Sequence, residues 1–124
     1  MSEIQENYQA VNSLPVINFS YNWNKKLDCT AFTTIRVKNE SKFYVGRDYQ
    51  IHLVDKFVKN ATIKAIQYFH IKSLNEFMSY VDTGYSLAET TKVLERMYGK
   101  KIFAPDFLFC IILSYPLNTP CLKS

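Results

Sequence analysis

The sequence predicts an α+β fold, a small, curved, mostly antiparallel sheet or barrel with two short helices packed at one side. Three observations predict it. Several short strand-like segments follow one another up to residue 72, two helix-start signals then occur in succession, and an apolar run closes the domain. Helices that are grouped, instead of alternating with strands, are typical of α+β architecture. A doubly wound parallel sheet is not expected, and no Gly-x-Gly-x-x-Gly sequence supports one.

The composition is that of one folded domain. The chain has 124 residues, 48% of them hydrophobic, and its nine Phe, nine Tyr and one Trp are far more apolar bulk than a disordered chain carries. The apolar run 107–113 is expected to be a strand buried on both faces, and is much shorter than the ~20 residues that cross a bilayer, so no membrane partner is expected. We expect an N-terminal arm over 1–15, one domain over 16–115 and a C-terminal tail over 116–124.

The domain is expected to begin with a strand and a turn. Residues 16–21 are rich in apolar side chains, and Val16, Phe19 and Tyr21 are the candidate core positions. The stretch 22–26 combines Asn and Lys residues in a turn-like pattern. This turn separates the first strand from the next strand pattern, which starts at residue 33.

The second predicted strand alternates strictly between two faces. One face consists of Thr33, Ile35 and Val37. The other, more polar face consists of Thr34, Arg36 and Lys38. Because side chains of a strand alternate in direction, Thr34 and Arg36 are expected to project from the same face.

Two more strands are expected before the helices. The earlier one has apolar residues at every second position, at Tyr49, Ile51 and Leu53, and a polar turn over 55–60 follows it. The later one, over 61–72, is long. Its shared apolar face consists of Ile63, Ala65, Phe69 and Ile71. Gln67 interrupts this face, which predicts a β-bulge there.

Both helix starts carry a capping box, in which a Ser and a Glu side chain satisfy free amides of the first turn. The boxes begin at Ser73 and at Ser86, with Glu76 and Glu89 three residues later. Helical spacing predicts one buried stripe on each helix, comprising Leu74, Phe77, Met78 and Val81, and then Leu87, Thr91, Leu94, Met97 and Tyr98. Gly99 suits the left-handed position after the second helix.

Charge and cysteine content restrict the function classes. Fifteen Lys and Arg against eleven Asp and Glu give a net charge of +4, which is less than a dedicated DNA binder carries. The excess fits a solvated surface of mixed sign or a weak polyanion-binding face. Three cysteines without a C-x-x-C pair, together with two His, predict no metal site and no other cofactor. Reduced thiols and the lack of a secretion signal predict a cytoplasmic location.

Two groups of residues are candidates for binding chemistry. A Thr34 hydroxyl beside the Arg36 fork suits a planar amide, a carboxylate or a phosphate, although a solvent-facing strand predicts the same alternation. Asp82 and Tyr85 flank Gly84 between the two helices. An acid and an aromatic in one connection can orient and stack a base, and the alternative is a turn whose Tyr covers the core.

The order of these motifs resembles that of a known family. Residues 32–36 (Phe-Thr-Thr-Ile-Arg), followed by 44–49 (Tyr-Val-Gly-Arg-Asp-Tyr), resemble the core of ASCH domains, in the PUA-like superfamily. Residues 83–99 are similar to the late helix of that family. In all, the resemblance covers residues 16–115. The resemblance implies a PUA-like small β-barrel with helices packed around it and a cleft for RNA or a nucleoside.

Some small members of this family are amidohydrolases that remove an acyl group from N4-acetylcytidine with a Lys, a Thr and a Glu. Carried over to this chain, the family Thr falls on Thr34 and the family Arg on Arg36. The Lys position falls on Ala31, and the Glu position falls on or beside Thr83, with Asp82 as the nearest acid. A Thr hydroxyl is a poor nucleophile without a neighbouring base, so this departure favours binding over catalysis.

Three functions follow as hypotheses. The first is a cleft for RNA or a modified nucleoside, lined by Thr34, Arg36, Asp82 and Tyr85, with phosphate and stacking contacts from Lys26, Lys38 and Trp23. The alternative is a hydrolase acting on an acylated nucleoside, with Thr34 as nucleophile and Asp82 as acid and base. The second alternative is a protein-interaction domain that uses exposed aromatic side chains.

Overall fold

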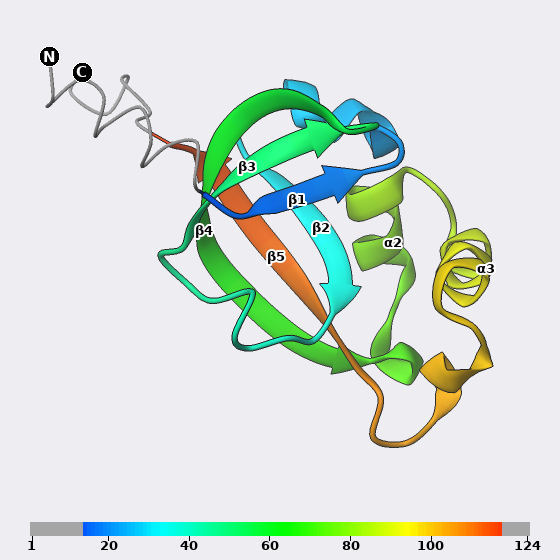
Figure 1. Cartoon of the computed structure of the whole chain (residues 1–124). Helices are drawn as coiled ribbons and strands as arrows, with labels where there is room; N and C mark the ends of the chain where they lie inside the picture. Colours follow the sequence, from blue (N-terminus) through cyan, green and yellow to red (C-terminus); the bar gives the residue numbers. More distant parts are fainter. Residues whose placement is uncertain (1–13, 118–124) are drawn as a thin grey trace, which may run out of the picture.

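Five strands form a single curled sheet in the computed structural model, which describes residues 14–117 (Figure 1). The strands are β1 (Val16–Phe19), β2 (Phe32–Val37), β3 (Asp48–Leu53), β4 (Lys56–His70) and β5 (Leu108–Pro116). The helices are α2 (Glu76–Thr83) and α3 (Leu87–Tyr98), with three short 3₁₀ segments, η1 (Trp23–Asp28), η2 (Ile71–Ser73) and η3 (Lys100–Phe103). Both α-helices lie at one side of the sheet, so the predicted α+β class is confirmed.

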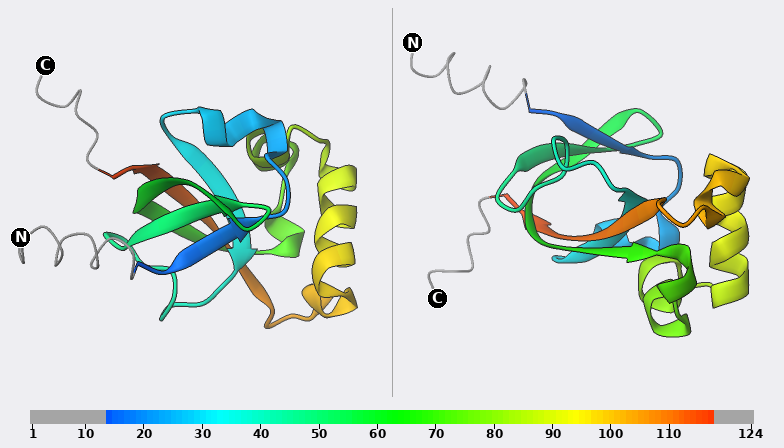
Figure 2. Two further views of the ribbon diagram at one scale, coloured as in Figure 1. Left: turned by 45° about the horizontal axis from the view of Figure 1, so that its top comes forward. Right: turned by 90° about the horizontal axis from the view of Figure 1, so that it is seen from below.

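The strand order is β1-β3-β4-β5-β2, which leaves β1 and β2 at the two edges. The pairing of β1 with β3 is parallel and the other three pairings are antiparallel, as expected of a mostly antiparallel sheet. The sheet curls into a half-barrel, so that its edges approach one another (Figure 2). Arg36 on β2 donates a hydrogen bond from Nη1 to the Asn18 carbonyl on β1, at 3.3 Å. We call the gap between these two edges the seam.

The curl separates two hydrophobic clusters. The cluster inside the curl comprises Ile17, Phe19, Leu27, Phe32, Phe43, Tyr49, Ile51, Ala61, Ile63, Cys110 and Ile112. The cluster between the sheet and the helices comprises Ile35, Phe69, Ile71, Leu74, Leu94, Ile102 and Phe109. β5 lies between β4 and β2 and contributes to both clusters, which confirms the expected strand buried on both faces.

A bulge in β4 corrects the predicted face of that strand. The pairing of β4 with β5 shifts register between Ile63 and Ala65, so Lys64 is the extra residue, whereas the sequence pattern placed the bulge at Gln67. One extra residue reverses the side-chain alternation beyond it. Ile63 therefore packs inside the curl while Phe69 packs under the helices, and the two do not share a face.

Of the three core positions predicted for the first strand, Phe19 is confirmed, whereas Val16 and Tyr21 are wrong. Ile17 and Phe19 are buried, whereas Val16 is 39% and Tyr21 56% exposed. Ile17 lies opposite Ile51 of β3 in the parallel pairing, and this partner decides which side chains face the core. The polar stretch after it is not a simple turn but the start of η1.

The hairpin between β3 and β4 is tighter than predicted. Val54 and Asp55 form a two-residue connection between Leu53 and Lys56, and both have positive φ, at 50° and 65°. Two consecutive positive φ values are what a type I′ hairpin requires. The polar residues after Asp55 therefore belong to β4, not to a turn over 55–60.

Helix α2 begins later than predicted, and its predicted stripe is only partly covered, because Leu74 is buried and Met78 packs against the cluster between the sheet and the helices. Asn75 caps it by accepting a hydrogen bond from the Met78 amide, and the Ser73 box does not form. Phe77 is 79% and Val81 47% exposed, whereas the polar residues Ser79, Asp82 and Thr83 are buried. The helix thus turns its polar face to the protein interior, which brings Asp82 toward the seam.

Helix α3 begins at the predicted capping box. Ser86 and Glu89 exchange both hydrogen bonds of the box, and Gly99 follows the helix with a φ of 88°. Thr90 and Leu94 are buried, but Met97 is 56% exposed, so the predicted stripe is only partly covered. None of the helices in residues 14–117 has the length and apolar character to span a membrane.

The termini of the predicted domain are placed in part. Residues 14 and 15 accept hydrogen bonds from Gln50, through the carbonyls of Leu14 and Pro15, so they extend the edge formed by β1. Pro116 belongs to β5, one residue beyond the predicted boundary of the domain. The rest of the expected arm (1–13) and tail (118–124) lies outside the described residues.

The two cysteines in the described residues are expected to differ sharply in reactivity. Cys29 is exposed, whereas Cys110 is fully buried and burial raises the pKa of its thiol to about 11. At pH 8 only about one Cys110 in a thousand would be a thiolate. We expect iodoacetamide to modify Cys29 far faster than Cys110 in the folded protein, as followed by peptide mass spectrometry. Equal rates without denaturant would contradict this burial.

Candidate functional site

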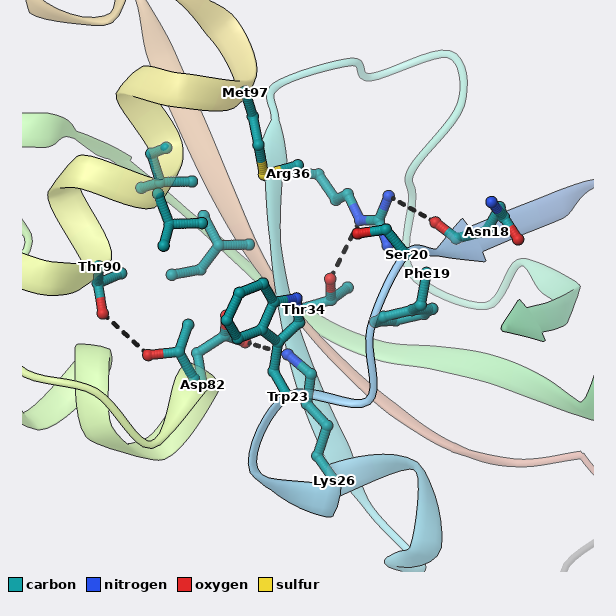
Figure 3. Close-up of a pocket in the computed structure, with 14 residues that line it drawn as sticks. Asn18, Phe19, Ser20, Trp23, Lys26, Thr34, Arg36, Asp82, Thr90 and Met97 are labelled. Atoms are coloured by element: carbon teal, nitrogen blue, oxygen red, sulfur yellow. Dashed lines mark hydrogen bonds and ion pairs between the residues drawn. The ribbon is translucent and has the colours of Figure 1, made fainter. Parts of the chain in front are cut away.

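A pocket of about 170 Å³ lies at the seam, where the sheet stops short of closing (Figure 3). Its lining comes from two stretches that are far apart in the sequence, one containing β1, η1 and β2 and the other containing α2 and α3. Phe19 and the α3 residues Val93, Leu94 and Met97 provide apolar lining. The polar side chains come mainly from Lys26, Thr34, Arg36, Asp82, Thr83 and Thr90.

A buried ion pair lies in the pocket. Lys26 Nζ is 2.9 Å from Asp82 Oδ1, and each side chain is only 6% exposed. Thr33 also donates its hydroxyl to Asp82 Oδ1, at 2.9 Å. Within residues 14–117 no hydrogen bond is made to Asp82 Oδ2, which leaves this oxygen able to accept one from a ligand.

Burial lowers the pKa of Lys26, and this effect outweighs the opposite influence of Asp82. The nearby Arg36 lowers the pKa of Lys26 further. The charged form of the Lys26 amine is therefore disfavoured by desolvation and favoured by its attraction to the Asp82 carboxylate.

The conformation of η1 directs Lys26 inward. Asn24 and Lys25 both have positive φ, at 58° and 52°, a strained backbone for residues with side chains. The segment is held from both ends, because the Asn22 side chain accepts from the Leu27 amide and Asn24 donates to the Tyr80 carbonyl of α2. The first of these bonds fixes the shape of η1, and the second docks it against α2.

Gly84 makes this docking possible. It follows α2 with a φ of 80°, and a Cβ atom at this position would lie 3.2 Å from the Asn24 side chain. Glycine thus serves both the left-handed conformation and the close approach of η1. The glycine that the sequence pattern placed between Asp82 and Tyr85 therefore positions the two halves of the ion pair.

Arg36 spans the seam. Its Nε donates to Thr34 Oγ1 at 3.1 Å, its Nη1 donates to the Asn18 carbonyl at 3.3 Å, and its guanidinium lies 4.7 Å from the centre of the Phe19 ring. Burial lowers the pKa of Arg36, but a guanidinium stays charged in proteins. Its hydrogen bonds within the described chain use two of the five N–H donors, so donors remain for a ligand.

The threonines of the pocket have distinct partners. Thr34 is only 3% exposed and accepts from Arg36, so it is not the solvent-facing residue of the alternative interpretation. Within residues 14–117 it makes no hydrogen bond to Lys26 or Asp82, and its hydroxyl proton has no acceptor. Thr83 and Thr90 hydrogen-bond each other at 2.9 Å and join α2 to α3 below the pocket.

The structure brings most of the predicted site residues together. The pocket is lined by Trp23, Lys26, Thr34, Arg36 and Asp82. Tyr85 lies beside it instead, with its ring edge-to-face against Trp23 at a centroid distance of 5.6 Å. Trp23 also contacts Tyr21 edge-to-face at 4.9 Å, so three aromatic rings continue from the pocket to the surface.

Sequence reasoning missed several residues of the site. Thr33 was assigned to the apolar face, although a hydroxyl at an apolar position was a signal for a buried hydrogen bond. Thr90 is buried in the structure, although its position beside the predicted stripe of α3 gave no signal of this. The contribution of Asn18 is a backbone carbonyl, and no pattern of side chains predicts which carbonyl the curled sheet brings to Arg36.

Together, these groups can hold a small planar ligand with polar edges. Arg36 and Lys26 donate hydrogen bonds, Asp82 accepts them, and Trp23 and Met97 offer apolar contacts.

Comparison of the chain with protein-family models, curated proteins and solved structures finds no match.

Proposed function

We propose that the protein is a PUA-like domain of the ASCH type whose seam pocket binds one nucleobase, presented by RNA or by a modified nucleoside. The observation that carries the proposal is the size and polarity of the pocket. Its volume of about 170 Å³ is close to that of an engineered cavity, about 150 Å³, that holds benzene. One planar ring therefore fits, and the sugar of a nucleoside would extend outside.

The polar groups match the edge of a base. Cytosine presents a carbonyl and a ring-nitrogen acceptor together with an amino donor. Arg36 supplies donors to the acceptors, and Asp82 Oδ2 accepts from the amino group. Trp23 provides an aromatic ring, as bases outside a duplex are commonly bound by stacking. The sequence resemblance to ASCH domains and the curled, helix-flanked sheet support the same assignment.

The arrangement favours binding over hydrolysis. The Thr34 hydroxyl accepts from Arg36, while Lys26 is paired with Asp82, so no base takes the proton from Thr34. Ala31, at the position of the family Lys, has no ionisable group. The hydrolase alternative would require Lys26 to leave Asp82 and reach Thr34 when the ligand binds.

A fluorescence titration tests the proposal. Trp23 is the only tryptophan of the chain, so its emission reports directly on the pocket. We expect saturable quenching by cytidine or N4-acetylcytidine, and Thr34→Val to weaken binding about 5-fold through loss of one hydrogen bond. Thr30→Val, at an exposed position before β2, is the matched control and should leave the affinity unchanged.

Chromatography of the same samples distinguishes binding of N4-acetylcytidine from its hydrolysis. The proposal expects N4-acetylcytidine to be recovered intact after incubation with excess protein. Turnover that disappears in Thr34→Val would replace it by the hydrolase alternative. Failure of cytidine, uridine, adenosine and N4-acetylcytidine to give any saturable response would refute a base-binding pocket.

A further inference from the structure

A second hollow adjoins the seam pocket and is lined by cations. It has a volume of about 240 Å³ and shares Arg36 with the pocket. Arg36, Lys38 and Lys42 contribute three positive charges, and no carboxylate lines it; the remaining residues are Val37, Asn39, Phe43 and Tyr98. We call this feature the cationic hollow.

The three cations of the hollow are poorly neutralised. Lys38 Nζ is 4.0 Å from Glu40 Oε2, and these side chains are 34% and 70% exposed, so the pair is weak. Lys42 contacts the Phe43 ring, at 5.4 Å, and Arg36 is hydrogen-bonded only to neutral oxygens. In the described chain, Glu40 is the one acid within salt-bridge distance of these cations.

Such a cluster suits a phosphate group. A guanidinium and two ammonium groups around one hollow provide charge-assisted hydrogen bonds that a phosphate accepts and that an uncharged nucleoside cannot use. The loop that carries Lys42 is held in place, because Arg47 donates to the carbonyls of Ser41 and Lys42 at 3.1 and 2.8 Å. The position of the Lys42 backbone is therefore fixed before any ligand arrives.

An aromatic groove adjoins the pocket as well. Its volume is about 340 Å³, and it is lined by Tyr21, Asn22, Asn24, Lys25, Thr83, Gly84 and Tyr85. Thr83 also lines the seam pocket, and Trp23, in the pocket, contacts both tyrosines of the groove. Tyr21 is 56% and Tyr85 40% exposed, so their rings are open to stacking by a base.

We infer that the ligand is a single-stranded RNA segment and not a free nucleoside. One base enters the seam pocket, an adjacent phosphate lies in the cationic hollow, and a neighbouring base stacks in the aromatic groove against Tyr21 or Tyr85. This inference rests on the proposed function and adds the class of ligand. Two extra hollows, one for charge and one for stacking, are of no use to a lone nucleoside.

Calorimetric titration of the full chain with three probes tests the inference. The probes are cytidine, cytidine 5′-monophosphate and the RNA trinucleotide of cytidine. We expect the monophosphate to bind about 10-fold and the trinucleotide about 100-fold more tightly than cytidine at about 50 mM salt. Raising the salt to about 200 mM should weaken the trinucleotide with a log–log slope of about −0.7, for the one phosphate in the cationic hollow, and leave cytidine unchanged.

Paired variants assign the effect to the cationic hollow. Lys38→Ala/Lys42→Ala should remove most of the advantage of both phosphorylated probes and flatten the salt slope, without changing the affinity for cytidine. Lys72→Ala/Lys92→Ala removes the same charge from exposed positions elsewhere and should change none of the three affinities. Lys42→Ala alone, at an exposed position, serves if the double variant does not fold.

Tyr21→Ala separates a strand from a mononucleotide. It should weaken the trinucleotide about 10-fold and leave the monophosphate unchanged, because only the trinucleotide has a neighbouring base. Equal affinities for cytidine and the trinucleotide would overturn the inference and leave the proposed function standing. Equal losses of trinucleotide affinity in the two double-Lys variants would also overturn the inference, since the overall positive charge of the protein would then explain the salt effect. If no probe bound, the proposed function itself would fail.

Discussion

Replacing Lys26 by Met lowers the free energy of unfolding by about 3–5 kcal/mol, the cost of leaving one buried charge without its partner. The carboxylate of Asp82 then stays in a site that is 6% exposed, with Thr33 as its remaining hydrogen-bond donor in the described chain. Asp82→Asn should cost a similar amount. The double variant Lys26→Met/Asp82→Leu should be less destabilised than the sum of the two, because it buries no unpaired charge.

Urea denaturation measures these differences, and the chain supplies a matched control. Lys38 and Glu40 form the other ion pair in residues 14–117, at 4.0 Å, with side chains that are 34% and 70% exposed. Lys38→Met and Glu40→Gln should each change the free energy of unfolding by less than about 0.5 kcal/mol. If Lys26→Met lowered the free energy of unfolding no more than Lys38→Met does, the Lys26–Asp82 pair would not stabilise the fold at the seam.

The pH dependence of the free energy of unfolding tests whether the buried charge of Lys26 causes the loss of stability in Asp82→Asn. Burial holds the pKa of Lys26 below its ordinary value of 10.5, and Asp82 is the group that raises it again. In Asp82→Asn the pKa of Lys26 falls further, so the folded state binds fewer protons than the unfolded state from that lowered pKa up to 10.5. The free energy of unfolding of Asp82→Asn should therefore rise with pH in this window relative to Lys26→Met/Asp82→Asn. A constant difference between the two variants would contradict this.

If the proposed RNA binding holds, replacing Arg36 by Met should abolish most of the binding energy at the seam. Arg36 lines both the seam pocket and the cationic hollow, so the variant would lose the proposed contacts to the base and to the phosphate together. Hydrogen bonds to charged groups contribute about 1.5–3 kcal/mol each, so we expect the trinucleotide to bind at least about 100-fold more weakly. Calorimetry measures the affinity, and thermal unfolding shows whether the fold persists.

Two further substitutions test whether charge or shape matters at this position. Arg36→Lys keeps the charge but lacks the planar fork that reaches Thr34 and Asn18 together, so binding should stay about 10-fold or more below that of the unaltered protein. Arg96→Met removes an exposed guanidinium from α3 and should have no effect. Full recovery of binding by Arg36→Lys would reduce the role of Arg36 to a point charge.

Features encoded by neighbouring residues were predicted correctly. The Ser86 capping box, the positive φ of Gly99 and the buried strand β5 depend on short-range patterns, and each occurs in the structure. The alternation that placed Thr34 and Arg36 on one face is confirmed by the hydrogen bond between their side chains. These features need only the local period of a strand or a helix.

Features decided by distant partners were not predictable in this way. The phase of β1 depends on its parallel pairing with β3, and the face of β4 depends on a bulge at Lys64. The buried polar face of α2 makes sense only once Asp82 meets Lys26, which is 56 positions away in the sequence. The candidate site was therefore predicted as a set of residue types, while the seam that brings them together was not.

The seam also has a consequence for self-association. Within residues 14–117, β1 and β2 are the two edges of a sheet that curls without closing, and an unpaired edge is a template for pairing with a second chain. Here the edges of β1 and β2 flank a pocket that contains the charges of Arg36, Lys26 and Asp82. A foreign strand inserted between them would have to strip these groups of their partners, which is energetically costly. We therefore expect the polar groups of the pocket to disfavour pairing with a foreign strand at the seam of the described sheet.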